Sequence, residues 1–369
     1  MCSRKLDHHV ADLRKPLLSL TAVTALLGIA GGIGRSGLLA VPPQVAASHD
    51  FLMTVAVLGS LVALERTGPG PPNPSHSGPA LLAVSGLAAS AAPTGPLAAA
   101  LASVGSAVAV ASSLGYYLRH RSVALGLIAG GFASLAASSL LIALGAPLLR
   151  VLPLLMCYPL LVIAGERVEL ASGLQRLSRG APGWARGHHA AALLLLAVGI
   201  ASLAAFSWQF EPLFGIPLIA GGLWLLLRDP VVRVGMRAKG IHRYVALNMT
   251  AGYSWLAAAG VLHLISGPLG LPVQLRVHSF YLGFVFHAIV AHAPLILPAL
   301  VGIGRPLYSR WLYGSTGLLT PSLILRFAGI STGALSAYLT GVALNAVSIA
   351  VLAAVLILNA LRKRTSEAG

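Results

Sequence analysis

Apolar runs of roughly 20 residues, separated by short polar segments, constrain this chain more than any other feature. A helix of about 20 residues crosses the hydrocarbon core of a bilayer, because each residue adds about 1.5 Å. Strands of a membrane barrel would be shorter and would alternate in polarity. Hydrophobic residues make up 57% of the chain, charged residues 9%, and mean hydropathy is +0.85. The sequence therefore predicts an all-α polytopic transmembrane helical bundle.

We expect about 12 spans in a single integral membrane domain that covers residues 1–369. The segments 79–94 and 97–117 are joined only by a turn containing Pro and Gly, so they could instead form one broken span and a re-entrant piece. Losing one span would move one terminus across the membrane. The expected spans are 16–34, 50–64, 79–94, 97–117, 122–146, 150–165, 188–208, 213–227, 243–266, 277–301, 311–330 and 336–361.

The net charge of +16 could indicate a nucleic-acid partner, but the positions of the basic residues favour a membrane explanation. With the N-terminus inside, all but four of the 25 Lys and Arg residues fall on the cytoplasmic side, as the positive-inside rule requires. We therefore expect a prokaryotic inner membrane protein with both termini cytoplasmic, lipid around it and no nucleic acid bound. The four exceptions are Arg35, Arg150, Arg276 and Arg326.

The polar segments are too short to form a soluble domain. Residues 1–15 form a basic cytoplasmic segment, and its position before an apolar run resembles a secretory signal, but eleven further spans favour an uncleaved first span. Residues 67–78 are rich in Pro, Gly and Ser, which predicts a flexible cytoplasmic loop, and 362–369 form a cytoplasmic tail. The cysteines, Cys2 and Cys157, give no disulfide framework and no thiolate metal site.

Carboxylates are absent from the middle of the predicted spans. Carriers driven by protons or sodium commonly keep a carboxylate near the midplane, so this absence disfavours such a mechanism. The acids lie at the predicted outer edge, Asp50 and Glu211, or at the inner edge, Glu65, Glu166, Glu169 and Asp229.

Histidines stand inside the predicted bundle instead. His49 opens the second span, His263 lies near the outer end of the ninth, and the tenth carries His278, His287 and His292. Imidazole ligates haem iron, copper and zinc, and it can enter the membrane uncharged. The alternative role of each histidine is an interhelical hydrogen bond.

Helix geometry limits which histidines can share a metal. His278 and His292 are about 21 Å apart along a helix axis, so one ion cannot join them. His49 and His278 both enter from the outside, at a similar depth on different helices, and could hold one haem between them. His263 could join this layer. Met53, one turn after His49, could supply a thioether or could simply pack in the core.

Two further patterns concern the inner half of the bundle. Pro294 and Pro298 follow His292, and each proline frees a carbonyl one turn earlier, which predicts a kink. The kink could aim His292 into the bundle and expose polar backbone to a cavity, or the prolines could be only structural. The strings that end in Glu65-Arg66 and Glu166-Arg167 are similar and could reflect an internal repeat. Such a pair at an interface is more often an anchor and ion pair than a catalytic device.

Several strings together resemble the NnrS family of membrane proteins. The similarity is spread along the chain and rests on the order of the strings and the number of spans. The strings are His49-Asp-Phe-Leu-Met53, Ala63-Leu-Glu-Arg66, Gly165-Glu-Arg-Val-Glu-Leu170, Ala251-Gly-Tyr-Ser-Trp-Leu256, His278-Ser-Phe-Tyr-Leu-Gly-Phe284, Ala291-His292-Ala-Pro and Leu323-Ile-Leu-Arg326.

This resemblance implies a twelve-span protein that contains haem and copper and handles nitric oxide. It carries His49, His278, His292 and Arg326 over as site residues. The second histidine string departs from the family, since it reads Ala-His-Ala-Pro-Leu where NnrS proteins typically have Gly-His-Thr-Gly-Arg, and His287 has no counterpart there.

If haem is bound, the outer arginines acquire a predicted role. Arg35, Arg276 and Arg326 could pair with the haem propionates. Alternatively they extend to lipid headgroups or pair with Asp50 and Glu211.

Three functions remain open from the sequence. The first is a haem or copper protein that binds, senses or detoxifies a small gas such as nitric oxide. The second is a transporter or channel for a small solute, and the third is a scaffold or assembly factor for a respiratory enzyme. No nucleophile or acid-base constellation is legible, so enzymatic activity and protein partners are left undecided.

Overall fold

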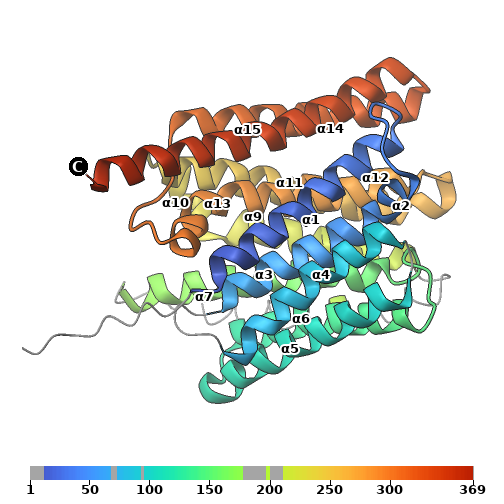
Figure 1. Cartoon of the computed structure of the whole chain (residues 1–369). Coiled ribbons are helices and arrows are strands. Elements are labelled where there is room, and N and C mark those ends of the chain that lie inside the picture. Colours follow the sequence, from blue (N-terminus) through green and yellow to red (C-terminus); the bar gives the residue numbers. More distant parts are fainter. Residues whose placement is uncertain (1–11, 68–72, 93–94, 178–196, 200–210, 369) are drawn as a thin grey trace, which may run out of the picture.

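The computed structural model describes residues 12–67, 73–92, 95–177, 197–199 and 211–368, and these residues form helices and no β-strand (Figure 1). The all-α class is therefore confirmed. Most of the predicted span 188–208, together with Cys2, lies outside the described residues.

The first part of the chain contains α1 (Arg14–Arg35), α2 (Pro43–Phe51), a π-helical segment η1 (Leu52–Val57), α3 (Leu58–Arg66), the 3-10 turn η2 (Pro74–His76), α4 (Ser77–Ala91), α5 (Pro96–His120), α6 (Val123–Ala143) and α7 (Leu152–Leu177). The second part contains η3 (Glu211–Phe214), α9 (Gly215–Arg228), α10 (Pro230–Gly235), α11 (Ile241–Leu269), α12 (Val273–His278), the π-helical segment η4 (Ser279–Val285), α13 (Phe286–Val301), η5 (Arg310–Leu312), α14 (Tyr313–Thr332) and α15 (Leu335–Ala368).

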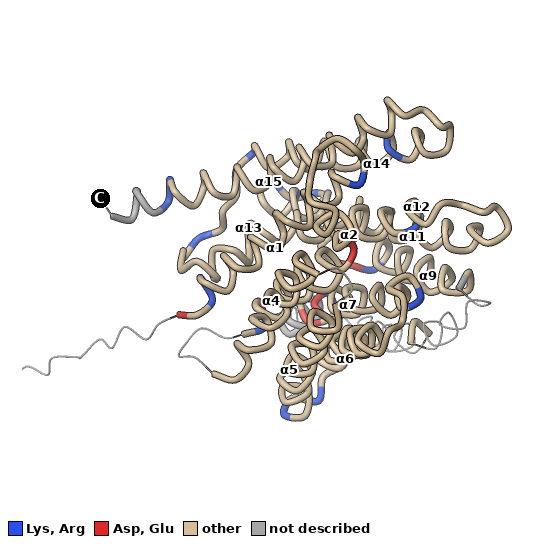
Figure 2. Tube along the Cα trace, turned by 45° about the vertical axis from the view of Figure 1, so that its right-hand side comes forward, with Lys and Arg blue, Asp and Glu red and all other residues tan. Residues whose placement is uncertain are grey.

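Seven helices among the described residues are long and apolar enough to cross a membrane, and a shorter apolar helix covers Pro212–Arg228. Most of the length of the helices lacks charged residues (Figure 2). This supports the predicted polytopic membrane protein, whereas the number of 12 spans stays a prediction. The seven are Arg14–Arg35, Pro43–Arg66, Pro96–His120, Val123–Ala143, Ile241–Leu269, Val273–Val301 and Leu335–Lys363.

The ambiguous pair of segments after residue 78 forms two helices, α4 and α5, which pack against each other. At 15 residues, α4 is about 22 Å long, shorter than the hydrocarbon core. Within the predicted loop 67–78, the Asn73 side chain accepts a hydrogen bond from the Ser75 amide, and His76 of η2 is buried. The helix α15 continues into the predicted tail as far as Ala368.

The helices that carry His49 and His278 lie in the middle of the bundle. The hairpin of α14 and α15 lies along one margin and the hairpin of α5 and α6 along the opposite one (Figure 1). Both views place α2 close to α12 at one end of the molecule (Figures 1 and 2). We call this end the His49 end, and the opposite end, where α3 finishes at Arg66, the Glu65 end.

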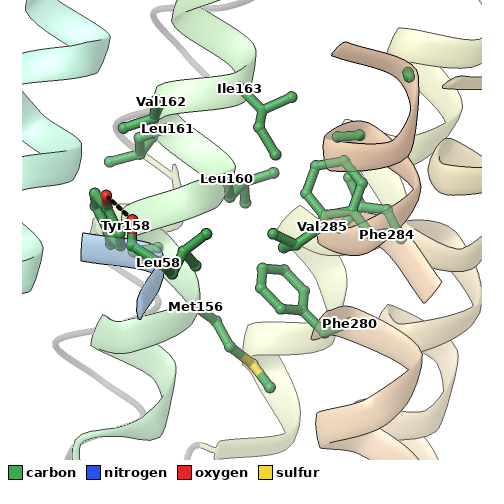
Figure 3. Close-up of a cluster of buried hydrophobic side chains, with 14 of the residues drawn as sticks. Leu58, Met156, Tyr158, Leu160, Leu161, Val162, Ile163, Phe280, Phe284 and Val285 are labelled. Carbon is green, nitrogen blue, oxygen red and sulfur yellow. Dashed lines mark hydrogen bonds between the residues drawn. The ribbon is translucent and has the colours of Figure 1, made fainter. Parts of the chain in front are cut away.

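Each of these two helices contains a π-helical segment, η1 in Pro43–Arg66 and η4 in Val273–Val301. Buried Phe280, Phe284 and Val285 of η4 face Met156 and Leu160 of α7 (Figure 3). On the other side of α7, the Tyr158 hydroxyl donates to the Leu58 carbonyl directly after η1, at 3.2 Å (Figure 3). The helix α7 therefore packs against both irregular helices.

The prolines of α13 free two carbonyls, and both find partners inside the protein. Pro294 cannot donate to Val290, and the Tyr244 hydroxyl donates to the Val290 carbonyl instead, at 3.1 Å. Pro298 cannot donate to Pro294, and the Leu307 amide takes that place at 2.8 Å. The expectation that these carbonyls face a cavity is thus wrong, because the surrounding chain satisfies them.

We expect Tyr244→Phe to lower the free energy of unfolding by about 1–3 kcal/mol, since it leaves the Val290 carbonyl buried without a donor. In a Pro294→Ala background, the backbone amide gained by the substitution can donate to the Val290 carbonyl. Tyr244→Phe should therefore lower the free energy of unfolding clearly less in that background. Thermal unfolding in detergent of the two single variants and the double variant measures this coupling. Equal costs in both backgrounds would contradict the assignment.

Candidate functional site

His49 is held in one orientation against α1. Its Nδ1 lies 2.7 Å from the Gly28 carbonyl, which can only accept, so Nδ1 carries the proton and Nε2 keeps a lone pair. Glycines on α1 make room for the ring, because a Cβ on Gly32 would lie 2.6 Å from His49 Cε1. Within the part of the chain that the structure describes, Nε2 of His49 has no hydrogen-bond partner.

His278 has the same arrangement at the end of α12. Its Nδ1 donates to the carbonyl of Gln274, one turn earlier, at 2.9 Å, and Nε2 keeps its lone pair. No described residue forms a hydrogen bond with this Nε2. Both residues are partly exposed, and each has an Nε2 lone pair of the kind that binds a metal.

The helices α2 and α12, which carry His49 and His278, lie close together at the His49 end (Figures 1 and 2). The charges of Arg35 and Arg326 act on both imidazoles. Each histidine lies next to a π-helical segment, which starts three residues after His49 and directly after His278. Such segments are frequent at functional sites.

The two helices also begin alike, a similarity that sequence reasoning missed. Each follows an N-cap proline in extended conformation, Pro42 and Pro272, and each carries Gln two residues later and a His-x-Phe string about one turn further on. The signal was present in the sequence as Pro42-Pro-Gln44 and Pro272-Val-Gln274. It indicates an internal repeat different from the Glu-Arg strings.

Met53 and His263 lie apart from this pair. Met53 packs against α1, where a Cβ added to Gly28 would lie 2.6 Å from its sulfur. His263 is buried on α11 and meets Phe214 edge to face, with ring centroids 5.4 Å apart. These contacts correspond to core packing.

His287 belongs to a closed hydrogen-bond chain. Trp255 Nε1 donates to Thr320 Oγ1 at 3.2 Å, the Thr320 hydroxyl donates to His287 Nε2 at 3.1 Å, and His287 Nδ1 donates to the Gly283 carbonyl at 2.6 Å. Both ring nitrogens of His287 therefore have hydrogen-bond partners. This series of hydrogen bonds links α11, η4 and α14.

His292 is occupied in a similar way. Its Nδ1 donates to the Ala288 carbonyl at 2.7 Å, and its Nε2 accepts from the Arg167 guanidinium at 2.5 Å. The interhelical hydrogen bond, which the sequence left as the alternative role, describes both His287 and His292 as the structure places them.

The three outer arginines differ in their partners. Arg35 pairs with Asp50 at 2.7 Å and also donates to the carbonyls of Ala46 and Ala47, so its guanidinium is used by α2. Arg276 is buried on α12. Arg326 on α14 is buried beneath the Tyr338 ring, with Cζ 5.6 Å from the centroid.

At the Glu65 end, α7 connects the two histidine-bearing helices. Arg66 of α3 pairs with Glu166 at 3.0 Å and with Glu169 at 3.5 Å, and Arg167 donates to His292 of α13. The two similar Glu-Arg strings thus pair with each other across helices. We call Arg66, Glu166, Arg167 and His292 the inner clasp, and its geometry is that of an anchor.

We expect Glu166→Gln to destabilise the protein by about 1–3 kcal/mol, because it removes the charge that neutralises a partly buried Arg66. Glu169→Gln is the matched control, since its side chain is 53% exposed against 16% for Glu166 and lies farther from the same guanidinium. Thermal unfolding of both variants tests the clasp, and a larger loss for Glu169→Gln would contradict it.

Among the described residues, no group of three or more His, Cys, Asp or Glu side chains is arranged to hold a metal ion.

Residues 14–361 match the family described as a domain of unknown function, DUF8744. The match covers α1 to the end of the apolar part of α15. The chain belongs to this family. No curated protein and no solved structure matches it.

Proposed function

We propose that this DUF8744 protein binds haem, copper or both at the His49 end, with His49 and His278 as ligands. The observation that carries the proposal is that the two imidazoles have the same hydrogen-bonding pattern. Both have Nδ1 fixed by a carbonyl, and both offer an Nε2 lone pair that no described residue uses. Hydrogen bonding of the second nitrogen is the usual way in which proteins orient a metal-ligating histidine.

The residues present fit such a group in their chemistry. Haem iron takes two axial ligands and copper accepts imidazole readily, so a pair of histidines suffices where a cluster of three is missing among the described residues. His263, His287 and Met53 are committed to packing or hydrogen bonds, and His292 lies about 21 Å along the helix from His278. We therefore restrict the ligand set to His49 and His278.

When bound, a haem or copper centre supplies a site where a small gas can coordinate or exchange an electron. The chain's contribution is to orient both imidazoles and to exclude bulk water with the surrounding helices. Nitric oxide as the gas rests on the resemblance to the NnrS family alone.

The proposed arrangement in the membrane has 12 spans, both termini in the cytoplasm and a prokaryotic inner membrane around it. The distribution of Lys and Arg supports this orientation. It places the His49 end outside and the inner clasp inside. A reporter protein that is active only in the cytoplasm, fused after Gly369, tests this orientation.

A transporter or channel is the second candidate. The repeated pattern of a proline cap, a histidine and a π-helical segment on two central helices favours it, since many carriers are built from repeats with the binding site between them. Solute flux in proteoliposomes, without any bound cofactor, would move this function ahead of the metal proposal.

The first test is an absorption spectrum, oxidised and reduced, with iron and copper analysis of protein expressed with ample haem and copper. We expect about one haem or copper per chain, because two imidazoles define one site. The double variant His49→Ala, His278→Ala should lose it, whereas His242→Ala, which alters an exposed histidine, should keep it. A full signal in the double variant would rule out these ligands.

A further inference from the structure

Arg326 is a buried cation without an acidic partner. It is 8% exposed, and none of the described Asp or Glu residues lies within ion-pair distance of it. Its Nε has no hydrogen-bond partner among the described residues, and its guanidinium lies over the Tyr338 ring. Tyr338 also interacts with the guanidinium through its hydroxyl. A neutral tyrosine attracts a cation through its ring and hydroxyl but does not neutralise it.

This arginine is held in place by close packing of α14 on α15. A Cβ on Gly341 would lie 2.5 Å from the Arg326 amide nitrogen, and a Cβ on Gly329 would clash with the backbone of Tyr338. The two helices therefore touch along their backbones at this point. A shift of the helix therefore cannot carry the guanidinium out of the interior. The free-energy cost of burying its charge must be offset by groups next to it.

The surroundings leave the site positive. Arg326 lies on α14, which contacts the η4 segment that begins directly after His278, and α2 with His49 lies close to α12 (Figures 1 and 2). The charge of Arg326 also acts on both imidazoles. The carboxylate described in that region, Asp50, is already paired with Arg35. Asp50 and Arg35 cancel each other, and the charge of Arg326 remains.

We infer that Arg326 is an anion receptor that holds one carboxylate or small oxyanion next to His49 and His278. A guanidinium offers paired N–H donors that match the two oxygens of such an anion, and burial strengthens these bonds. The inference shares its location with the proposed metal site but does not require a metal.

Two sources could supply this chemistry. A free anion could enter from the side of the His49 end, or the carboxylate of a bound cofactor such as haem could occupy the receptor. Competition separates them, because a cofactor carboxylate excludes a free anion and a separate anion site does not.

The test is calorimetric titration with formate and with nitrate, in chloride-free buffer, of protein with measured haem and copper content. We expect one site per chain in protein without cofactor. Arg326→Gln should weaken binding roughly 100-fold, because it removes a charge-assisted bidentate contact, and Arg326→Lys should weaken it by roughly tenfold. Arg150→Gln, which alters an exposed arginine, is the control and should leave binding unchanged.

Binding that survives cofactor loading supports a free anion, and binding that cofactor loading abolishes supports a cofactor carboxylate. Both outcomes support the receptor, and both stand apart from metal content, which is measured separately. Equal affinity in wild-type and Arg326→Gln protein, with both folded by thermal unfolding, would overturn it. One tightly bound phospholipid per chain, lost in Arg326→Gln, would also overturn it by assigning Arg326 to a headgroup.

Discussion

Backbone groups inside a bilayer have no water to bond with, and this constraint explains the central part of the structure. The helices that carry His49 and His278 are irregular, since each contains a π-helical segment and one contains two prolines. Neighbouring helices compensate through tyrosines, with Tyr244 bonding the carbonyl that Pro294 frees and Tyr158 bonding Leu58. The irregular helices persist because specific partners surround them.

The same two helices are fixed at one end and chemically open at the other. At the Glu65 end, the Glu166-Arg167 string of α7 reaches both, pairing with Arg66 on one side and His292 on the other. At the His49 end, the Nε2 atoms of His49 and His278 have no hydrogen-bond partner among the described residues, and Arg326 has no acidic partner among them. This contrast separates polar groups that hold the bundle together from polar groups that are left to bind something else.

Histidines and arginines that look alike in the sequence have different partners in the structure. Five histidines in the predicted spans were candidates for metal ligation, because imidazole chemistry is the same for each, and only their predicted depth favoured His49 and His278 as a pair. Neighbours from distant parts of the chain occupy His287 and His292, through Thr320 and Arg167. Arg35 and Arg326 diverged likewise, since only Arg35 of these two meets an acid among the described residues. Such pairings link residues more than a hundred positions apart in one case, and no local pattern encodes them.

The sequence by itself determined the class of the protein, because long apolar runs and few charges leave no alternative to membrane helices. It also predicts a similar depth for His49 and His278, since both predicted spans enter the membrane from the same side. The tertiary structure alone decided which ring nitrogens remain available and which arginine lacks a counter-charge. These are properties of contacts between helices, and helix packing is set by the whole set of side chains rather than by any one segment.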